Sequence, residues 1–174
     1  MATPDLPDSN LILTGFMGTG KSTVGKRVAL ITGRRFVDAD EVIVERAGMS
    51  IPQIFAAQGE PAFRKLEKEV CRDLAAERGL IVATGGGMLV DAGNRETMLS
   101  SGLVVCLDAA PAVIRARLAP SMADRPLAGD WEALYEKRRA AYAAIPTHVD
   151  TSGKTPHKTA EEIIALWRRT SSSR

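Results

Sequence analysis

The feature that most constrains the fold of this chain is a phosphate-binding loop, Gly15–Ser22, which follows the short apolar run Leu11–Leu13. The loop reads GFMGTGKS and matches the pattern G-x-x-x-x-G-K-S in full. Its glycines allow backbone N–H groups to converge on phosphates, and a helix that begins at Lys21 directs its positive dipole end to the same place. The sequence therefore predicts a buried strand, this loop and a helix in succession, with ATP bound at the loop.

Two side chains at the end of the loop are expected to act on the triphosphate. Lys21 is expected to reach the β and γ phosphates, and the Ser22 hydroxyl is expected to ligate Mg²⁺. A guanine-specific GTPase should also carry an N-K-x-D signature, and the sequence contains none. The motif therefore indicates an ATP-dependent enzyme.

Apolar strands and amphipathic helices alternate along the rest of the chain. Periodicity and turn residues predict strands at Leu11–Leu13, Phe36–Val37, Leu80–Ala83, Leu103–Leu107 and Thr147–Val149. Helices are expected at Lys21–Thr32, Glu41–Ala47, Glu60–Arg78, 92–100, Pro111–Leu118, Trp131–Tyr142 and Ala160–Arg169, with a short helix from the Ser50 cap to Phe55 and a break at Gly59. This alternation is typical of a three-layer α/β/α fold with a central five-stranded parallel sheet, which binds ligands beyond the carboxyl ends of its strands.

The length of 174 residues suits a single domain. We expect one domain over 1–174, with an ordered core over about 11–169 and disordered ends at 1–10 and 170–174. Residues 119–129 hold two prolines, one glycine and few large apolar groups, so they are expected to form a mobile loop.

Composition excludes several classes of protein. The net charge of +2 is too small to indicate nucleic-acid binding. No apolar stretch approaches the roughly 18 residues that span a membrane, and the N-terminus lacks a basic and apolar leader. Cys71 and Cys106 fit no zinc-site spacing and are expected to be reduced core thiols, while His148 and His157 are expected to be structural or solvated. We therefore expect a cytoplasmic monomer that acts on a small molecule.

Two strand ends offer candidate carboxylates for a metal ion. Asp38 and Asp40 follow the second predicted strand two residues apart, so they share one face of an extended segment. One of them can hold Mg²⁺ while the other meets a substrate hydroxyl, which is the division that phosphoryl transfer needs. Asp108 ends the fourth predicted strand and can instead cap the helix that follows it. Asp38 is the preferred metal residue, and Asp108 is the alternative.

Taken together, these motifs resemble the shikimate kinase family over about residues 11–167. The matching strings are Gly15–Ser22, Phe36–Asp40, Ile54-Phe55 with Gly59-Glu60 and Phe63-Arg64 with Glu67, Gly85–Gly87, Arg125–Leu127, and Arg138 four residues before Tyr142. Only the first string is specific by itself, but their joint order and spacing are highly specific. The resemblance implies a P-loop kinase fold with a substrate-binding segment at about 40–68 and a mobile lid at about 119–129. It also implies transfer of the γ-phosphoryl group of ATP to the 3-hydroxyl of shikimate.

The resemblance implies roles for individual residues in binding shikimate. Arg64 and Arg138 match the family's two carboxylate-binding arginines, although spacing alone does not separate Arg138 from Arg139. Planar guanidinium groups suit this role because they hold a carboxylate through paired hydrogen bonds. Asp40 matches the residue that binds the substrate hydroxyls and accepts a proton. The glycines of the predicted turn offer backbone N–H groups to the substrate or the γ-phosphate, and they are Gly85, Gly86 and Gly87.

A second set of residues is implied to bind the nucleotide. These residues are Gly18, Thr19, Gly20, Lys21, Ser22 and Thr23, with Arg117, Arg125, Lys154 and Pro156. Arg125 matches a lid arginine that neutralises charge on the transferred phosphoryl group, and it joins Lys21 and Asp40 as the implied catalytic set. Arg117 and Pro156 match the pair that encloses adenine, with Arg115 as the alternative to Arg117. The segment 119–124 is less basic and less glycine-rich than is usual in the lids of this family.

Two other functions fit parts of the sequence. A kinase of another small acceptor, such as gluconate or a nucleoside monophosphate, would share the phosphate loop. A monophosphate dianion should need more cationic residues than Arg64 and Arg138. A non-catalytic nucleotide-binding module would be expected to lack at least one of Lys21, Asp40, Arg64 and Arg125, and all four are present.

Overall fold

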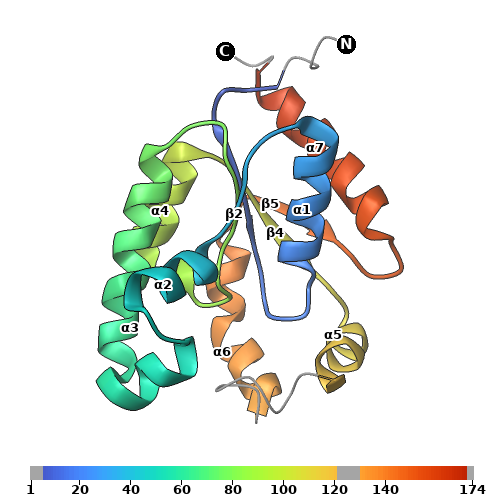
Figure 1. Ribbon diagram of the computed structural model, residues 1–174. Coiled ribbons are helices and arrows are strands. Elements are labelled where there is room, and N and C mark those ends of the chain that lie inside the picture. Colours follow the sequence, from blue (N-terminus) through green and yellow to red (C-terminus); the bar gives the residue numbers. More distant parts are fainter. Residues whose placement is uncertain (1–5, 121–129, 172–174) are drawn as a thin grey trace.

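A single parallel sheet forms the centre of the molecule (Figure 1). The computed structural model describes residues 6–120 and 130–171. Its five strands pair in parallel in the order β2-β3-β1-β4-β5. Their bounds are β1 Asn10–Thr14, β2 Phe36–Asp38, β3 Ile81–Ala83, β4 Gly102–Asp108 and β5 Thr147–Asp150. The predicted five-stranded parallel sheet is confirmed, and β1, which leads into the phosphate loop, lies in its middle.

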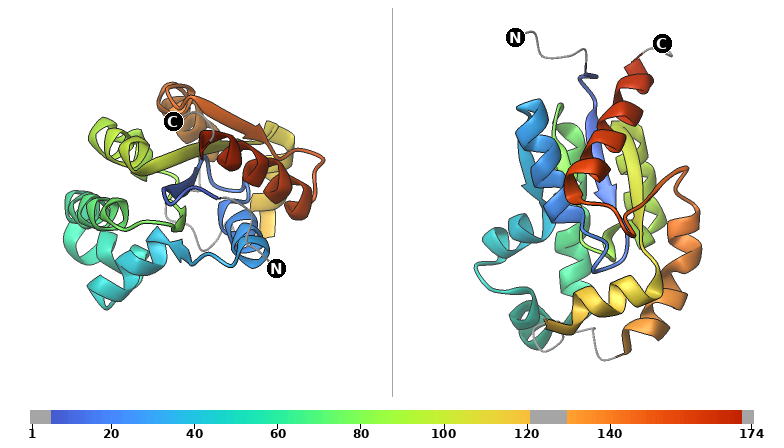
Figure 2. Two further views of the ribbon diagram at one scale, coloured as in Figure 1. Left: turned by 90° about the horizontal axis from the view of Figure 1, so that it is seen from above. Right: turned by 90° about the vertical axis from the view of Figure 1, so that its right-hand side faces the viewer.

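Helices cover both faces of this sheet (Figure 2), which confirms the predicted three layers. Their bounds are α1 Lys21–Thr32, α2 Ala39–Ala47, α3 Ile51–Ala76, α4 Ala92–Ser101, α5 Pro111–Leu118, α6 Trp131–Ala143 and α7 Pro156–Ser171. Leu11 and Leu13 of β1 pack with α1 and α7, whereas Ile12 packs with the helices of the other face. Because both faces are covered, this central strand is apolar at three successive positions.

The long helix α3 is interrupted by a non-helical residue. Gly59 has φ 81° and ψ 169°, outside the helical region, and Pro61 follows it. The predicted break at Gly59 is confirmed, and it divides α3 into two arms. The rings of Phe55 and Phe63, one from each arm, lie 4.9 Å apart between centroids. The two arms therefore pack against each other through an aromatic pair.

The prediction that residues 1–10 form a disordered leader is wrong for residues 6–10. Asn10 begins β1 and is fully buried. Its Nδ2 donates to the carbonyl oxygens of Leu74 at 3.2 Å and Glu77 at 2.9 Å, and its Oδ1 accepts from the amide of Leu80 at 2.9 Å. The side chain thus satisfies carbonyl groups at the end of α3, which lack partners within the helix. Its partners lie 64 to 70 residues away, so the residues next to Asn10 in the sequence do not reveal that it is buried.

The last helix also differs from its prediction. α7 begins at Pro156 rather than at Ala160, because the fixed φ of proline suits the first turn of a helix. It continues to Ser171, so Thr170 and Ser171 are helical, and the predicted frayed tail is wrong for these two residues.

A short 3-10 turn at Met88–Val90 follows the glycines after β3, and no sequence pattern predicted it. Most of the predicted mobile loop, residues 121–129, lies outside the described residues. None of the described helices combines the length and the apolar character that a membrane-spanning segment needs.

Replacing Asn10 by alanine is expected to lower the free energy of unfolding by about 2–5 kcal/mol. Two buried backbone groups and one partly buried group would lose their partner, and each buried unsatisfied group costs about 1–3 kcal/mol. Urea unfolding followed by circular dichroism measures the change, and Ser9→Ala serves as the neighbouring control, expected to stay within about 0.5 kcal/mol of the wild type. An Asn10→Ala protein as stable as that control would contradict the assigned role.

Candidate active site

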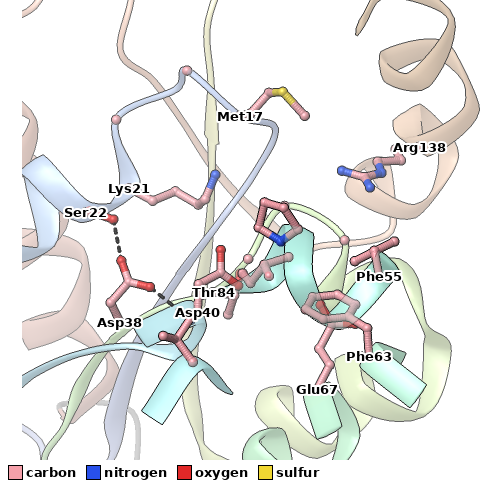
Figure 3. Close-up of a pocket in the computed structure, with 18 of the residues that line it drawn as sticks. Met17, Lys21, Ser22, Asp38, Asp40, Phe55, Phe63, Glu67, Thr84 and Arg138 are labelled. Atoms are coloured by element: carbon pink, nitrogen blue, oxygen red, sulfur yellow. Dashed lines mark hydrogen bonds between the residues drawn. The ribbon is translucent and has the colours of Figure 1, made fainter. Parts of the chain in front are cut away.

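A cavity of about 770 Å³ opens at the carboxyl ends of the strands (Figure 3). The phosphate loop, the start of α2, both arms of α3, the turn after β3, and single residues of α5 and α6 line it. The predicted site residues on its wall are Gly18, Gly20, Lys21, Ser22, Thr23, Asp38, Asp40, Arg64, Gly85, Gly86, Gly87, Arg117 and Arg138. The structure therefore brings into one cavity residues that the sequence assigned to two different ligands.

The phosphate loop is shaped by its own backbone. Gly20, at the start of α1, has φ 98°, which residues with a Cβ rarely adopt. Thr19 Oγ1 donates to the carbonyl of Phe16 at 2.7 Å, and Lys21 Nζ donates to the carbonyls of Gly15 at 2.8 Å and Phe16 at 2.9 Å. Among the described residues no side chain caps α1, and its first turn holds no acidic residue. The N–H groups at the start of α1 are therefore suited to an anion.

Ser22 and Asp38 form a pair of oxygen ligands beside this loop. Ser22 Oγ donates to Asp38 Oδ2 at 2.7 Å, and Asp38 Oδ1 accepts from the amide of Asp40 at 3.0 Å, so Asp38 also caps α2. Neighbouring oxygens of an octahedral Mg²⁺ lie about 2.9 Å apart when the bonds are about 2.0–2.1 Å long. The pair therefore fits Mg²⁺. Asp108, the alternative, faces His148 and does not line this cavity.

Asp40 is a carboxylate held in a partly desolvated position. Burial raises its pKa above the ordinary value of 3.8, and the charge of Asp38 acts in the same direction, while Lys21 and Arg64 act against it. Gly85 makes room for it, because a Cβ there would lie 2.5 Å from Asp40 Oδ1. A raised pKa makes this carboxylate a stronger base than an exposed aspartate.

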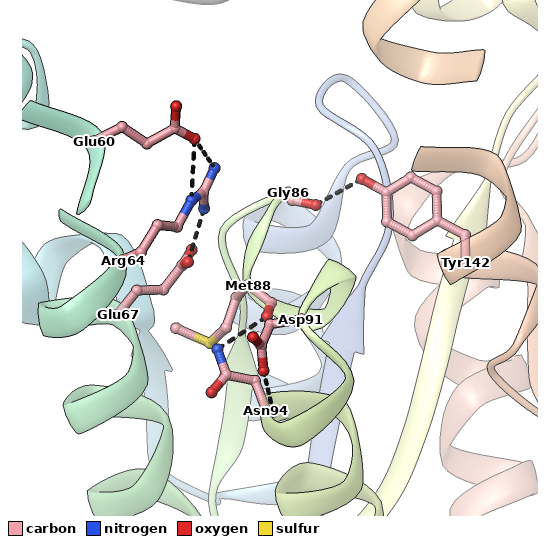
Figure 4. Close-up of polar contacts among 8 residues, drawn as sticks. All are labelled: Glu60, Arg64, Glu67, Gly86, Met88, Asp91, Asn94 and Tyr142. Atoms are coloured by element: carbon pink, nitrogen blue, oxygen red, sulfur yellow. Dashed lines mark hydrogen bonds and ion pairs between the residues drawn. The ribbon is translucent and has the colours of Figure 1, made fainter. Parts of the chain in front are cut away.

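Two glutamates of α3 hold the Arg64 guanidinium in place (Figure 4). Arg64 Nε and Nη2 donate to Glu60 Oε1 at 3.3 and 3.2 Å, and Nη1 donates to Glu67 Oε2 at 2.7 Å. The Glu67 side chain is only 2 % exposed. Burial raises the pKa of its carboxyl group, and the charge of Arg64 opposes this shift. Glu67 had no expected role, although its place three residues after Arg64 is a helical ion-pair spacing.

Arg138 of α6 approaches Arg64 across the turn after β3. It is 6 % exposed. A Cβ added at Gly87 would lie 2.7 Å from Arg64 Nη1 and 3.2 Å from Arg138 Nη2, and one at Gly86 would lie 3.2 Å from Arg138 Nη1. Both guanidinium groups lie close to the backbone of this turn, which explains why residues 86 and 87 are glycines. Arg139 is 71 % exposed and pairs with Glu136, so the structure places Arg138, and not Arg139, at the cavity.

Tyr142 connects α6 to the same turn. Its hydroxyl donates to the carbonyl of Gly86 at 2.6 Å (Figure 4). Burial raises its pKa to about 12, so the hydroxyl remains a donor at neutral pH. This contact was not expected, because a tyrosine four residues after Arg138 on a helix gives no sign of a partner in a distant turn.

Arg117 of α5 lies against the phosphate loop. Its Nη1 donates to the carbonyls of Gly18 at 3.1 Å and Thr19 at 3.3 Å, and to Thr151 Oγ1 at 3.1 Å. Arg115 instead pairs with Glu132 of α6. The structure therefore places Arg117, and not Arg115, at the cavity wall.

The other residues implied for the nucleotide lie elsewhere. Lys154 pairs with Glu162 at 2.7 Å, and Pro156 is the first residue of α7. Neither is among the residues that line the cavity in the described part of the chain. The Thr19 hydroxyl is used within the loop, and Arg125 lies outside the described residues.

A phosphate loop that shares one cavity with a partly buried aspartate and two converging arginines defines a P-loop kinase for a small anionic acceptor. Comparison with known proteins identifies the family of kinases. The family model described as shikimate kinase matches residues 17–168, and the chain therefore belongs to the shikimate kinase family.

Individual relatives agree with this assignment. The shikimate kinase of Geobacter sulfurreducens is 46 % identical over 165 residues, covering 91 % of each chain. The shikimate kinase of Thermus thermophilus is 38 % identical over 169 residues, covering 93 % of this chain and 92 % of the relative. A solved structure, shikimate kinase from Acinetobacter baumannii in complex with shikimate, superimposes with a TM-score of 0.86 at 32 % identity, covering 95 % of this chain and 94 % of that one.

Proposed function

We propose that this protein transfers the γ-phosphoryl group of ATP to the 3-hydroxyl of shikimate, giving shikimate 3-phosphate and ADP. The observation that carries the proposal is the approach of the Arg64 and Arg138 guanidinium groups to Gly87, in the cavity that also contains Lys21 and Asp40. Two fixed guanidinium groups suit a carboxylate, and the adjacent aspartate suits the hydroxyls of the same small molecule.

The donor side of the cavity binds the triphosphate through the phosphate loop. Backbone N–H groups from Gly18 to Thr23 cradle the phosphates, and Lys21 exchanges its carbonyl partners for the β and γ phosphates. Ser22 and Asp38 hold Mg²⁺, which neutralises charge on the phosphates when it is bound. Arg117, beside Gly18, is the contact proposed for adenine.

The acceptor side orients shikimate and takes up its proton. Arg64 and Arg138 hold the carboxylate, and Glu60 and Glu67 keep the Arg64 guanidinium turned toward it. Asp40 accepts a hydrogen bond from the reacting hydroxyl and receives its proton as the phosphoryl group is transferred. Burial raises the pKa of Asp40, which strengthens it for this role.

A substrate panel tests the proposed reaction. Purified protein with ATP and Mg²⁺ is expected to release ADP only when shikimate is present, and ³¹P and ¹H NMR are expected to place the new phosphate at the 3-position. Gluconate and a nucleoside monophosphate serve as alternative acceptors. Release of ADP with either of them, and none with shikimate at saturating concentrations, would refute the acceptor assignment while retaining a P-loop kinase.

We also propose that the active unit is a single chain in the cytoplasm. All residues proposed to contact the two substrates belong to one chain, so the site needs no partner copy. Light scattering of the active protein is expected to give the mass of one chain, 18.6 kDa. A larger particle that loses activity on dilution would contradict this.

A further inference from the structure

A second cluster of chemically reactive side chains lies outside the kinase cavity, on β4 and β5. Cys106 and His148 are register partners on these neighbouring parallel strands. Asp108 follows Cys106 by two residues and therefore projects from the same face of β4. A separate cavity of about 250 Å³ adjoins the cluster and is lined by Asp108 and His148.

The three side chains come close enough to share one ion. His148 Nδ1 lies 2.8 Å from Asp108 Oδ2, and Cys106 Sγ lies 3.8 Å from Asp108 Oδ1. One ligand atom from each residue lies within 4.8 Å of the other two. Ligands of a tetrahedral zinc ion with ordinary bond lengths are about 3.4–3.6 Å apart. The observed separations bracket this value, so small side-chain rotations bring all three ligands to bonding distance.

The second nitrogen of His148 indicates how the ring is oriented. Nε2 lies 2.9 Å from the carbonyl oxygen of Ile145. A carbonyl oxygen only accepts, so Nε2 carries a hydrogen, and Nδ1 is the ring nitrogen that faces Asp108. A histidine ligand that donates its other N–H to a backbone carbonyl is the usual arrangement at protein metal sites.

We propose that Cys106, Asp108 and His148 bind a divalent cation of the zinc type. A sulfur and an imidazole nitrogen favour such an ion over Mg²⁺, which takes oxygen ligands. Three protein ligands leave one coordination position for water, and the Asp108 and His148 side chains, 46 % and 34 % exposed, leave a route for the ion. Burial raises the pKa of the Cys106 thiol to about 12, so the metal displaces a proton on binding.

The position of the cluster links it to the phosphate loop. The backbone carbonyl of Asp108 accepts from the amide of Thr151 at 2.8 Å and from its hydroxyl at 3.0 Å. Thr151 Oγ1 also lies 3.1 Å from the carbonyl of Thr19. Phe16 of the loop lines the cavity beside the cluster. An ion that fixes β4 to β5 therefore acts next to the elements that support the nucleotide.

Cobalt(II) is the probe that tests the site, because its absorption reports sulfur ligation. The full-length, nucleotide-free protein is titrated with Co²⁺ in excess Mg²⁺, which occupies the oxygen ligands near Ser22. We expect one equivalent of Co²⁺ to bind with the visible bands of tetrahedral coordination and a sulfur-to-cobalt charge-transfer band in the near ultraviolet. Zn²⁺ is expected to abolish both and to raise the melting temperature. Absence of the charge-transfer band would overturn the proposal.

Two variants test the proposed ligands, and a third serves as the control. Cys106→Ser is expected to lose the charge-transfer band, and Asp108→Asn, which keeps the side-chain shape, is expected to weaken Co²⁺ binding at least about tenfold. Cys71→Ser removes the other buried thiol and is expected to leave the spectrum unchanged. A band that survives Cys106→Ser, or one that disappears in Cys71→Ser, would contradict the site. If Cys106→Ser does not fold, as judged by circular dichroism, unaltered binding by Asp108→Asn would contradict it equally.

Discussion

Replacing Asp40 by asparagine is expected to lower kcat about 100- to 10,000-fold, the range over which a general base contributes to proton transfer. The amide has the shape of the carboxylate and fits beside Gly85, but it does not accept the proton of the shikimate hydroxyl. The KM for ATP is expected to stay within about threefold, because Asp40 is assigned to the acceptor. Steady-state ADP release at saturating substrates measures the loss, with Asp73→Asn as a remote control on α3.

The raised pKa of Asp40 provides two further readouts. Its folded pKa lies above 3.8, so kcat/KM is expected to fall as the pH drops through it, and the variant should lack this acidic limb. The pH dependence of folding stability has the opposite sign to that of kcat/KM. The buried charged form costs folding free energy above the folded pKa, and the cost disappears as the pH falls through that value. The asparagine variant is therefore expected to unfold no more easily than the wild type at neutral pH. A kcat within about tenfold of the wild type would contradict the proposed base.

Replacing Arg138 by methionine is expected to lower kcat/KM for shikimate by about 30-fold to 3,000-fold. Removing one partner of a buried charge pair costs about 2–5 kcal/mol, because the other charge loses its counterion in a desolvated place. Arg138 is 6 % exposed and approaches the same turn as Arg64, so the carboxylate would keep only one of its two guanidinium partners. The affinity for ATP is expected to be nearly unchanged. Kinetics with each substrate varied in turn separate the two effects.

Arg139→Met is the matched control for this experiment. It removes the same type of side chain one position later, where the guanidinium is exposed and pairs with Glu136. Its kcat/KM for shikimate is expected to stay within about threefold of the wild type, as for most exposed ion pairs. Equal losses for shikimate and ATP in Arg138→Met would contradict the division of the cavity into donor and acceptor sides.

The part of the site that could be predicted from sequence consists of residues in local motifs. The phosphate loop contains its own glycines, lysine and serine within eight residues, so its geometry depends little on the rest of the chain. The choice of Arg138 over Arg139 rested on the family resemblance, which places this arginine four residues before the tyrosine. The structure adds the physical reason: Trp131, Arg138 and Tyr142 are the buried residues of α6 and share one helical face.

Features that depend on distant partners were missed or left open. The choice between Arg117 and Arg115 depends on distant partners. Arg115 pairs with Glu132 on α6, whereas Arg117 donates to Thr151 after β5, and spacing along α5 reveals neither contact. The buried Asn10 was mistaken for part of a leader because its partners lie 64 to 70 residues away.

Cys71 and Cys106 are buried free cysteines, as expected. The proposed cation site shows the same limit, because rules for zinc spacing assume ligands that are close in sequence, whereas Asp108 and His148 lie 40 residues apart and meet through the parallel pairing of β4 and β5. Strand register was therefore the information that sequence patterns lacked.

The single cavity that runs from Ser22 to Arg138 has a consequence for inhibitor chemistry. A molecule that joins a polyphosphate to a cyclic carboxylate would occupy both halves at once. The second half then binds at the high effective concentration set by the linker, so the two modest affinities combine without any new contact. Because a Cβ at Gly85 would lie 2.5 Å from Asp40 Oδ1 and one at Gly87 would lie 2.7 Å from Arg64 Nη1, resistance through a bulkier residue at either position would displace the aspartate or the arginine that catalysis uses.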